Sequence, residues 1–199
     1  MGPEQLMALL AGRRGHFKTE SGYHSEWWFE LDRLFDEPAR LQPFVVQLAQ
    51  QLADYRVEVI CGPMTGGALL AERVAAELGC TYVFTERIVP AGKSGLFPVA
   101  YRVPEVHRAG LRGRTIAIVD DAVSAGSAAR GTYADLIACE ARPAVLGALF
   151  AFGPAAAQLA AAHQLGLVAL ASLPLGVWRP EECPHCRAGL PLEALTDVP

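Results

Sequence analysis

The sequence predicts an α/β protein with a central parallel sheet that is covered by helices on both faces. From residue 57 onward, short apolar runs rich in β-branched residues alternate with stretches of helical apolar spacing. The apolar runs carry no polar face, which is typical of buried parallel strands. One of them, Thr115–Val119, ends in two adjacent carboxylates, Asp120 and Asp121, before a small-residue loop that begins a helix. Because ligands of open α/β sheets bind beyond the carboxyl ends of the strands, this turn is the first candidate site.

Composition supports a single domain over residues 1–199. The chain is 52% hydrophobic and 19% charged, enough to bury one sizeable core. The net charge of −4 and the lack of a basic cluster argue against nucleic acid as a partner. Apolar runs stop well short of about 18 residues and the first residues lack a signal pattern, so we expect a cytoplasmic protein that does not contact a membrane. Five cysteines is an odd number, and a disulfide framework is not expected.

The first residues predict a helix and a hairpin. Leucines at helical spacing mark residues 3–11 as a helix, and residues 15–31 alternate polar and aromatic residues around Ser21 and Gly22. Pro38 precedes an apolar stripe at 3.6-residue spacing that continues to Leu52, which predicts an amphipathic helix.

The rest of the chain predicts a βα series. The expected strands are 57–61, 81–85, 115–119, 145–152 and 167–173, and the expected helices are 68–78, 127–138 and 155–164.

The loop after residue 119 has the properties of a cradle for a sugar phosphate. At a strand-to-helix turn the backbone N–H groups have no helical partner and the helix dipole is positive. Gly126 permits close approach of an anion, and Ser124 and Ser127 add hydroxyl donors. Asp120 and Asp121 would repel a phosphate, so they must serve hydroxyl groups or a metal-bound group of the same ligand. A purely structural turn is the weaker alternative, because adjacent buried carboxylates are costly without a partner.

A second glycine-rich turn follows the strand over 57–61. Its glycines can direct N–H groups toward one point, which fits a second anion. A tight connection without a ligand explains the same residues equally well.

The stretch from Glu86 to Gly113 is long for a loop of a compact domain. It carries basic residues, among them Arg87 and Lys93, and has glycines that could act as hinges. Such loops are usually functional or mobile, so a lid over the site is expected. The alternatives are a disordered excursion or a covering hairpin formed from residues 97–103.

Cys183 and Cys186 form a lone CxxC pair. Four-coordinate zinc needs two further ligands, which His163, His185 or a second subunit would have to supply. The pattern alone favours a tight structural turn over a metal or redox site, and no residue is assigned to a metal. Trp27, Trp28 and Phe29 are interpreted as hairpin packing in preference to a platform for a base.

The run Ile118–Ser127 resembles the phosphoribosyl pyrophosphate signature of type I phosphoribosyltransferases. Within that family the chain is most similar to orotate phosphoribosyltransferase. The similar segments are Gly15-His16-Phe17, Ser21-Gly22 and His24-Ser25 in the N-terminal hood, Gly62–Gly67 in the pyrophosphate loop, Phe84–Arg87 at the start of the flexible loop, and Cys183–Cys186 with Gly189 and Pro191 in the tail of a long-form branch.

The resemblance implies the type I phosphoribosyltransferase fold, with a hood segment (1–36), a flexible loop (86–113) and a C-terminal tail (174–199). It implies a Mg²⁺-dependent glycosyltransferase that moves ribose 5-phosphate from phosphoribosyl pyrophosphate (PRPP) to a nucleobase, in first place orotate for pyrimidine biosynthesis. It also implies a cytoplasmic homodimer. A dinucleotide oxidoreductase is disfavoured, because no GxGxxG motif follows a strand.

Site residues follow from the same resemblance. Asp120 and Asp121 would bind the ribose hydroxyls, and Lys93, Arg87 and Asp121 are expected to be catalytic. The substrate-binding set comprises Asp120, Asp121, Ala122, Val123, Ser124, Ala125, Gly126, Ser127, Gly62, Pro63, Met64, Thr65, Gly66, Gly67, Arg87, Ser21 and Gly22.

Three positions depart from the family pattern. Glu20 stands where many orotate enzymes have lysine, and the loop after Arg87 lacks the usual Lys-and-His-Gly pattern. No arginine follows the strand at Gly153-Pro154, where the family binds the carboxylate of orotate, although Arg179 could supply that charge. Two alternatives therefore stay open: the same reaction on another purine or pyrimidine base, and a non-catalytic regulator that binds PRPP.

Overall fold

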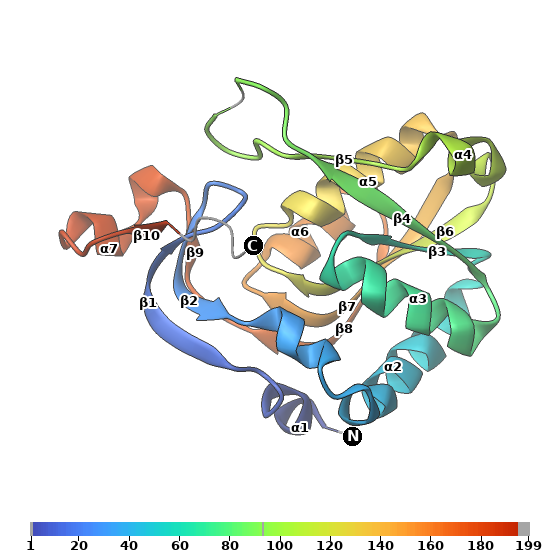
Figure 1. The fold of residues 1–199 in the computed structure, drawn as a ribbon, viewed down its shortest axis with the longest axis horizontal. Coiled ribbons are helices and arrows are strands. Elements are labelled where there is room, and N and C mark those ends of the chain that lie inside the picture. The colour runs from blue at the N-terminus through green and yellow to red at the C-terminus, as the bar shows by residue number, and fades with distance from the viewer. Residues whose placement is uncertain (1, 93, 195–199) are drawn as a thin grey trace.

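A six-stranded sheet forms the centre of the molecule in the computed structural model, which describes residues 2–92 and 94–194 (Figure 1). Its strand order is β5-β4-β3-β6-β7-β8, and all neighbours are parallel except the antiparallel pair β4 and β5. The strands are β3 (Val59–Pro63), β4 (Thr81–Ile88), β5 (Ala100–Arg102), β6 (Thr115–Val123), β7 (Arg142–Phe152) and β8 (Gly166–Leu173). The predicted α/β fold class is confirmed.

Helices cover both faces of this sheet. The longer helices are α2 (Pro38–Leu52), α3 (Gly66–Leu78), α5 (Ser127–Ala138) and α6 (Ala155–His163). The shorter ones are α1 (Pro3–Met7), α4 (Glu105–Arg108), α7 (Pro184–Arg187) and the 3₁₀ turns Leu31–Phe35, Ala53–Tyr55, Ala109–Leu111 and Pro180–Glu182. None of the described helices is both long and apolar enough to span a bilayer.

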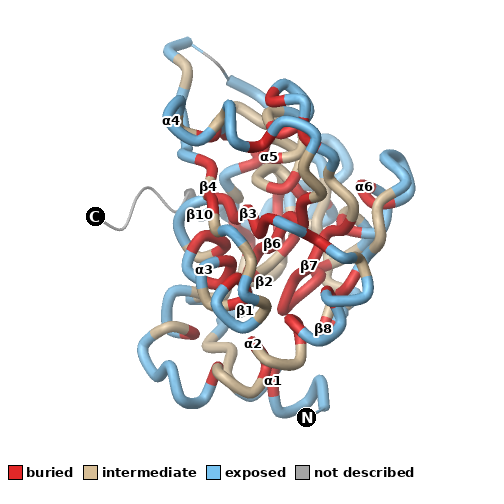
Figure 2. The backbone as a smooth tube through the Cα atoms, turned by 90° about the vertical axis from the view of Figure 1, so that its right-hand side faces the viewer, coloured by how far each residue is buried: buried red, intermediate tan, exposed pale blue. Residues whose placement is uncertain are grey.

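The period-2 alternation of the central strands explains the two-sided core. Along β6, Ala117 and Val119 pack with residues of α2 and α3, whereas Ile116 and Ile118 pack with residues of α5 and α6. Buried residues are concentrated along β3, β6 and β7 (Figure 2). The carboxyl ends of these strands are therefore held by a rigid core.

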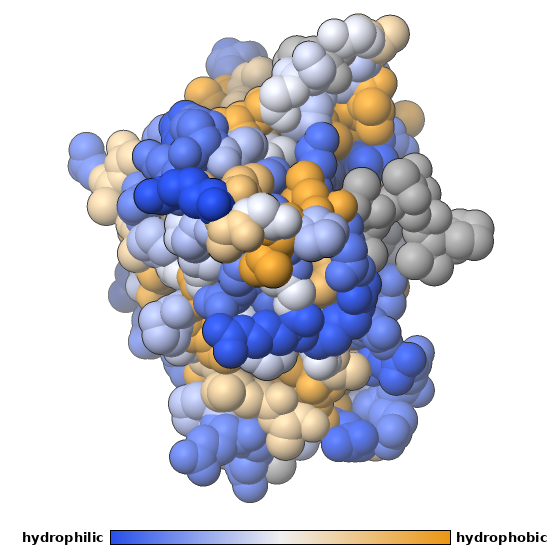
Figure 3. Space-filling view, turned by 90° about the vertical axis from the view of Figure 1, so that its left-hand side faces the viewer, coloured by the Kyte–Doolittle hydropathy of each residue, from blue (hydrophilic) through white to orange (hydrophobic). Residues whose placement is uncertain are grey.

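A second sheet of four short strands lies beside the first and is called the hood sheet below (Figure 1). Its order is β10-β1-β2-β9, built from β1 (Gly12–Lys18), β2 (His24–Phe29), β9 (Val177–Trp178) and β10 (Glu193–Ala194). The hairpin expected over 15–31 is present, and strands from the tail flank it on both sides. The outer surface on this side is largely hydrophilic with scattered apolar patches (Figure 3).

The stretch 86–113 is more ordered than a flexible loop. Strand β4 continues to Ile88 and pairs with β5 as an antiparallel hairpin, and α4 follows. The covering hairpin was thus the better interpretation for residues 100–102, and the described residues between β4 and β5 form no helix or strand. The reason is side-chain packing: Tyr101 and Val103 are buried against the core, which a local sequence pattern does not reveal.

Candidate functional site

Asp120 and Asp121 lie near the end of β6 and are buried, with exposed fractions of 6% and 8%. They are part of the strand and not of the following loop, because β6 continues to pair with the long strand β7. The Asp121 backbone N–H donates to Asp120 Oδ1 (3.1 Å), and the Ala122 N–H donates to Asp121 Oδ1 (2.8 Å). These bonds fix the direction of both carboxylates.

The glycines that begin α3 lie directly against this acidic pair. A Cβ atom on Gly66 would lie 2.0 Å from Asp121 Oδ2, and one on Gly67 would lie 2.5 Å from Asp120 Oδ1. The turns after β3 and β6 therefore meet, as expected for neighbouring parallel strands. A side chain at either position would displace one of the two carboxylates or the turn before α3.

Burial raises the pKa of both carboxyl groups, and the neighbouring charge of Asp121 raises the pKa of Asp120 further. The charged forms of such groups are stabilised by hydroxyl donors or by a cation. The pair is therefore suited to a polyhydroxylated ligand or to a ligand that carries a metal ion.

The turn from Ala122 to Ser127 encloses a small cavity of about 140 Å³. Gly126 has φ of +78°, in the left-handed region that favours glycine, and precedes the first residue of α5. The backbone N–H groups of the first turn of this twelve-residue helix face the turn. The cavity is lined by Thr19, Glu20, Ser21, Asp120 and residues 122–128.

Arg130 adds a positive charge that the sequence analysis did not assign to the site. Its Nε lies 3.8 Å from the position of a Cβ on Gly126. That Nε is buried and has no hydrogen-bond partner among the described residues, while the guanidinium lies 5.8 Å from the centre of the Phe97 ring. The one feature of the sequence that could have pointed to Arg130 is its position one helical turn after Gly126.

Glu20 lines the cavity, and its negative charge is paired with a positive charge. Its carboxylate accepts hydrogen bonds from Arg87 Nε (2.6 Å) and from the Tyr101 hydroxyl (2.7 Å). Burial, the bond to Glu20 and its charge raise the pKa of Tyr101, so the phenol stays neutral. Arg87 thus reaches the edge of the site through Glu20.

The turn between β1 and β2 forms the roof of the cavity. The Phe97 N–H donates to the Ser21 carbonyl (2.8 Å), and Thr19 Oγ1 lies 2.7 Å from Ser21 Oγ. Gly22 has φ of +81°, and a Cβ there would lie 2.6 Å from the Gly95 carbonyl oxygen. The hood and the segment 89–99 are therefore in direct contact above the site.

A second cavity of about 170 Å³ adjoins the first and shares Thr19, Ala122 and Ser124 with it. Its remaining lining residues are Ser25, Trp27, Trp28, Phe29, Leu31, Phe152 and Leu175. The Phe29 ring stacks on Trp27 (centroids 5.7 Å apart) and on Phe152 (4.9 Å). These aromatic residues do pack the hairpin, as expected, and they also line an apolar cavity.

No charged side chain lines this aromatic cavity within the described part of the chain. Arg179 is not among its lining residues, and it pairs with Glu181 (3.9 Å) on the surface.

The remaining site candidates are distributed as follows. Gly62 and Pro63 are buried within β3, while Met64 and Thr65 are exposed at the turn before Gly66. A Cβ on Gly62 would lie 2.2 Å from the Gly67 carbonyl oxygen, so Gly62 shapes the turn. Lys93 lies outside the described residues.

Comparison with known proteins gives a consistent result. A family model described as a phosphoribosyl transferase domain matches residues 31–153. Orotate phosphoribosyltransferase of Thermotoga maritima is 29% identical over 193 residues, which cover 96% of this chain and 92% of the relative. The enzyme of the same description from Caldanaerobacter subterraneus subsp. tengcongensis is 28% identical over 181 residues, 90% of this chain and 87% of the relative.

Solved structures share the fold. Orotate phosphoribosyltransferase from Aeropyrum pernix has a TM-score of 0.63 and 22% identity, with 86% of this chain and 94% of that chain covered. Adenine phosphoribosyltransferase from Rhodothermus marinus has a TM-score of 0.65 and 12% identity, with 86% and 98% covered.

Proposed function

The chain belongs to the phosphoribosyltransferase family, and from this premise we propose that it transfers ribose 5-phosphate from PRPP to a base, with orotate as the first candidate. The full-length relatives named orotate phosphoribosyltransferase support this choice of base. The observation that carries the proposal is the contact between the acidic pair and the glycine-rich turn, next to the cavity at the start of α5.

Each part of the site matches one part of PRPP. Asp120 and Asp121 accept hydrogen bonds from the two ribose hydroxyls. The N–H groups of the turn 122–127, with Ser124 and Ser127, bind the 5′-phosphate. The exposed residues Met64 and Thr65, together with Gly66, bind the diphosphate.

The chemical step is displacement of diphosphate at the anomeric carbon through an oxocarbenium-like state. The protein positions the reactants and stabilises the charge of the departing group, and no covalent nucleophile is required. Lys93 and Arg87 are the proposed sources of positive charge toward the diphosphate. The bond between Arg87 and Glu20 holds that guanidinium at the edge of the cavity.

The donor set suits Mg²⁺. This ion prefers oxygen ligands and usually binds through one or two carboxylates together with phosphates and water. Asp120 and Asp121 are buried carboxylates with raised pKa values, so a nearby cation would stabilise their charged forms. When bound, Mg²⁺ would neutralise charge on the diphosphate; the substrate's own oxygens and water would be its main ligands, and Asp120 and Asp121 are the protein carboxylates available to it.

The aromatic cavity favours a second candidate, an uncharged base. An apolar cavity lined by Trp27, Phe29 and Phe152 suits a planar base, but its lining offers no cation for the carboxylate of orotate. A charge-assisted hydrogen bond contributes about 1.5–3 kcal/mol, so its absence lowers affinity for an anionic base by roughly tenfold to a hundredfold.

Release of pyrophosphate separates these candidates. Purified protein with PRPP and Mg²⁺ should release pyrophosphate when orotate is added, and not with uracil, adenine, guanine or hypoxanthine. Release with one of the other bases only would support the second candidate. No release with any base, while calorimetry detects PRPP binding, would contradict an enzymatic role and favour a PRPP-binding regulator.

Arg130→Gln should raise KM for PRPP by about tenfold to a hundredfold, because the buried Nε is proposed to donate to the 5′-phosphate. Steady-state kinetics with varied PRPP measures the effect. Arg112→Gln is the matched control, since Arg112 forms an exposed ion pair with Glu140 (2.9 Å). An unchanged KM in the Arg130 variant would remove Arg130 from the phosphate site.

A homodimer and a cytoplasmic location are part of the same proposal. The homodimer rests on the resemblance to type I phosphoribosyltransferases, in which the flexible loop reaches the site of a neighbouring subunit, and the location rests on the pattern of apolar runs in the sequence. Sedimentation equilibrium of the purified chain measures the oligomeric state.

A further inference from the structure

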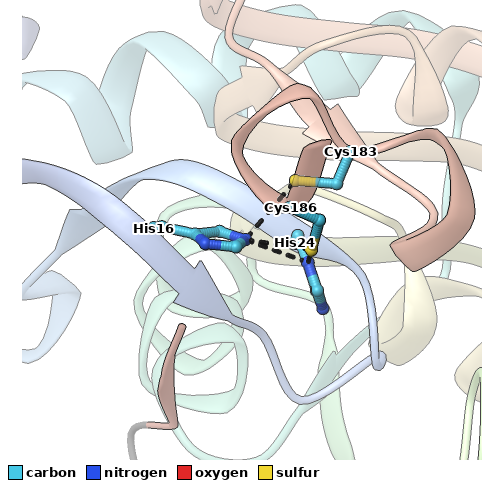
Figure 4. Close-up of side chains that lie close together, drawn as sticks. All are labelled: His16, His24, Cys183 and Cys186. Atoms are coloured by element: carbon cyan, nitrogen blue, oxygen red, sulfur yellow. Dashed lines mark hydrogen bonds between the residues drawn. The ribbon is translucent and has the colours of Figure 1, made fainter. Parts of the chain in front are cut away.

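Four side chains with metal-binding atoms meet where the hood sheet joins the tail. His16 comes from β1, His24 begins β2, Cys183 directly precedes α7, and Cys186 lies within α7 (Figure 4). One nitrogen or sulfur atom from each residue lies within 4.8 Å of the other three. The acidic pair and the phosphate turn take no part in this cluster.

The distances between these atoms match the edges of a tetrahedron around a zinc ion. With Zn–N of about 2.05 Å and Zn–S of about 2.3 Å, tetrahedral geometry places two nitrogens about 3.3 Å apart and a nitrogen and a sulfur about 3.6 Å apart. His16 Nε2 and His24 Nδ1 are 3.1 Å apart. The nitrogen–sulfur distances are 3.4 Å (Cys183 to His16), 3.6 Å (Cys186 to His16) and 3.2 Å (Cys186 to His24).

A second observation concerns the tautomer of His16. Its Nδ1 lies 3.0 Å from the backbone carbonyl oxygen of Leu190, which can only accept, so Nδ1 carries the hydrogen. In the neutral imidazole, Nε2 then directs a lone pair at His24 and at both sulfur atoms. A hydrogen bond from the other ring nitrogen to a carbonyl is how metal-bound histidines are usually oriented.

Hydrogen bonding alone explains this arrangement poorly. Nε2 of His16 has three neighbours within 3.6 Å, and two thiols can together donate only two weak hydrogen bonds to the two imidazole nitrogens. His16, His24 and Cys183 are buried, which leaves little water to compensate. A cation at the centre would bind all four lone pairs at once.

We propose that His16, His24, Cys183 and Cys186 bind one structural zinc ion as a Cys₂His₂ site. Thiolate and imidazole are the ligands typical of structural zinc, and four protein ligands leave no open position for catalysis. Two thiolates and two neutral imidazoles cancel the charge of the ion. Of the completing ligands that the lone CxxC pair left open, His163 stacks on Tyr133 of α5, His185 contributes no atom to the cluster, and no second subunit is needed.

The site ties the tail to the hood. β1 and β2 carry the histidines and α7 lies between β9 and β10, so a bound ion fastens both flanking strands to the hairpin. The turn between His16 and His24 contains Thr19 and Ser21, which line the phosphate cavity. Zinc therefore acts as a positioning element for the roof of the site.

Metal analysis of the untagged protein tests the proposal. After incubation with Zn²⁺ and dialysis, the wild-type chain should retain about one zinc ion per chain. The variant Cys183→Ser with Cys186→Ser should retain less than about a tenth of that, whereas Cys80→Ser, in a thiol remote from the cluster, should match the wild type. Equal zinc in the double variant, or none in the wild type, would overturn the proposal.

Two measurements on the wild-type protein cover the case in which the double variant fails to fold. Substitution with Co²⁺ should give the visible bands of a tetrahedral site and a thiolate-to-cobalt charge-transfer band. Alkylation read by mass spectrometry should spare the exposed Cys186 until a chelator is added. Immediate alkylation of Cys186 in the zinc-treated protein would contradict the zinc site. A disulfide between Cys183 and Cys186 in protein kept under reducing agent would contradict it as well.

Discussion

Replacement of Asp120 and Asp121 together by Asn is expected to lower kcat/KM for PRPP by about 10²–10⁴. Each carboxylate is proposed to accept a ribose hydroxyl, and hydrogen bonds to charged groups contribute about 1.5–3 kcal/mol each. The amides keep the shape of the side chains and can still accept the bonds from the Asp121 and Ala122 N–H groups. Pyrophosphate release with varied PRPP measures the loss.

The same substitutions should not unfold the protein. Asp54→Asn, at an exposed position in a 3₁₀ turn, is the matched control and should leave kcat/KM unchanged. PRPP affinity of the double variant equal to that of the wild type, measured by calorimetry, would refute the central assignment.

A pH series adds a check that does not depend on activity. Burial raises the folded-state pKa of Asp120 above its ordinary value of 3.8, so the folded state binds more protons than the unfolded state above that pH. This group therefore lowers the free energy of unfolding as pH rises from about 3.8 through the folded-state pKa. The Tm of Asp120→Asn should therefore exceed the Tm of the ligand-free wild type by a larger margin at about pH 7.5 than at about pH 5.

Gly66→Ala should raise KM for PRPP by about tenfold to a hundredfold. The added Cβ would lie 2.0 Å from Asp121 Oδ2, so either the turn before α3 or the carboxylate must move. Overpacking of a rigid site costs about 1–3 kcal/mol, and the displaced groups are those proposed to bind the diphosphate and the ribose. Kinetics with varied PRPP, together with a thermal melt, measures both effects.

Gly110→Ala serves as the control for that experiment. A Cβ at Gly110 meets no atom within 4 Å, and its φ lies outside the left-handed region. KM and Tm should both match the wild type. Wild-type kinetics in the Gly66 variant would mean that the turn does not need the close approach to Asp121, and the diphosphate assignment would fail.

The central sheet was predictable because its signals are local. The apolar stripe after Pro38 predicted α2 and its end at Leu52. The run before Asp120 predicted β6 from its first residue, although the strand continues to Val123, and the helix after it begins at Ser127 as expected. The meeting of the turns at Gly66 and Asp121 followed from topology, since parallel neighbours end at the same edge of a sheet.

The β1–β2 hairpin of the hood sheet was predicted, but its two outer strands were not, because their pairing is not local. β9 and β10 are two residues long each and have no periodicity of their own. They form only because β1 and β2 offer unpaired edges. The same distance in sequence hid the proximity of His16 to Cys183.

The order in which the chain is synthesised gives the hood sheet a further consequence. The six-stranded sheet is complete once residue 173 has left the ribosome, whereas both edges of the β1–β2 hairpin stay open until residues 177–194 follow. Open strand edges are templates for pairing with other chains, and contacts this remote in sequence form slowly. Before the tail strands pair, the chain would hold a folded core and a hairpin with two open edges, and this form is the one most prone to aggregate.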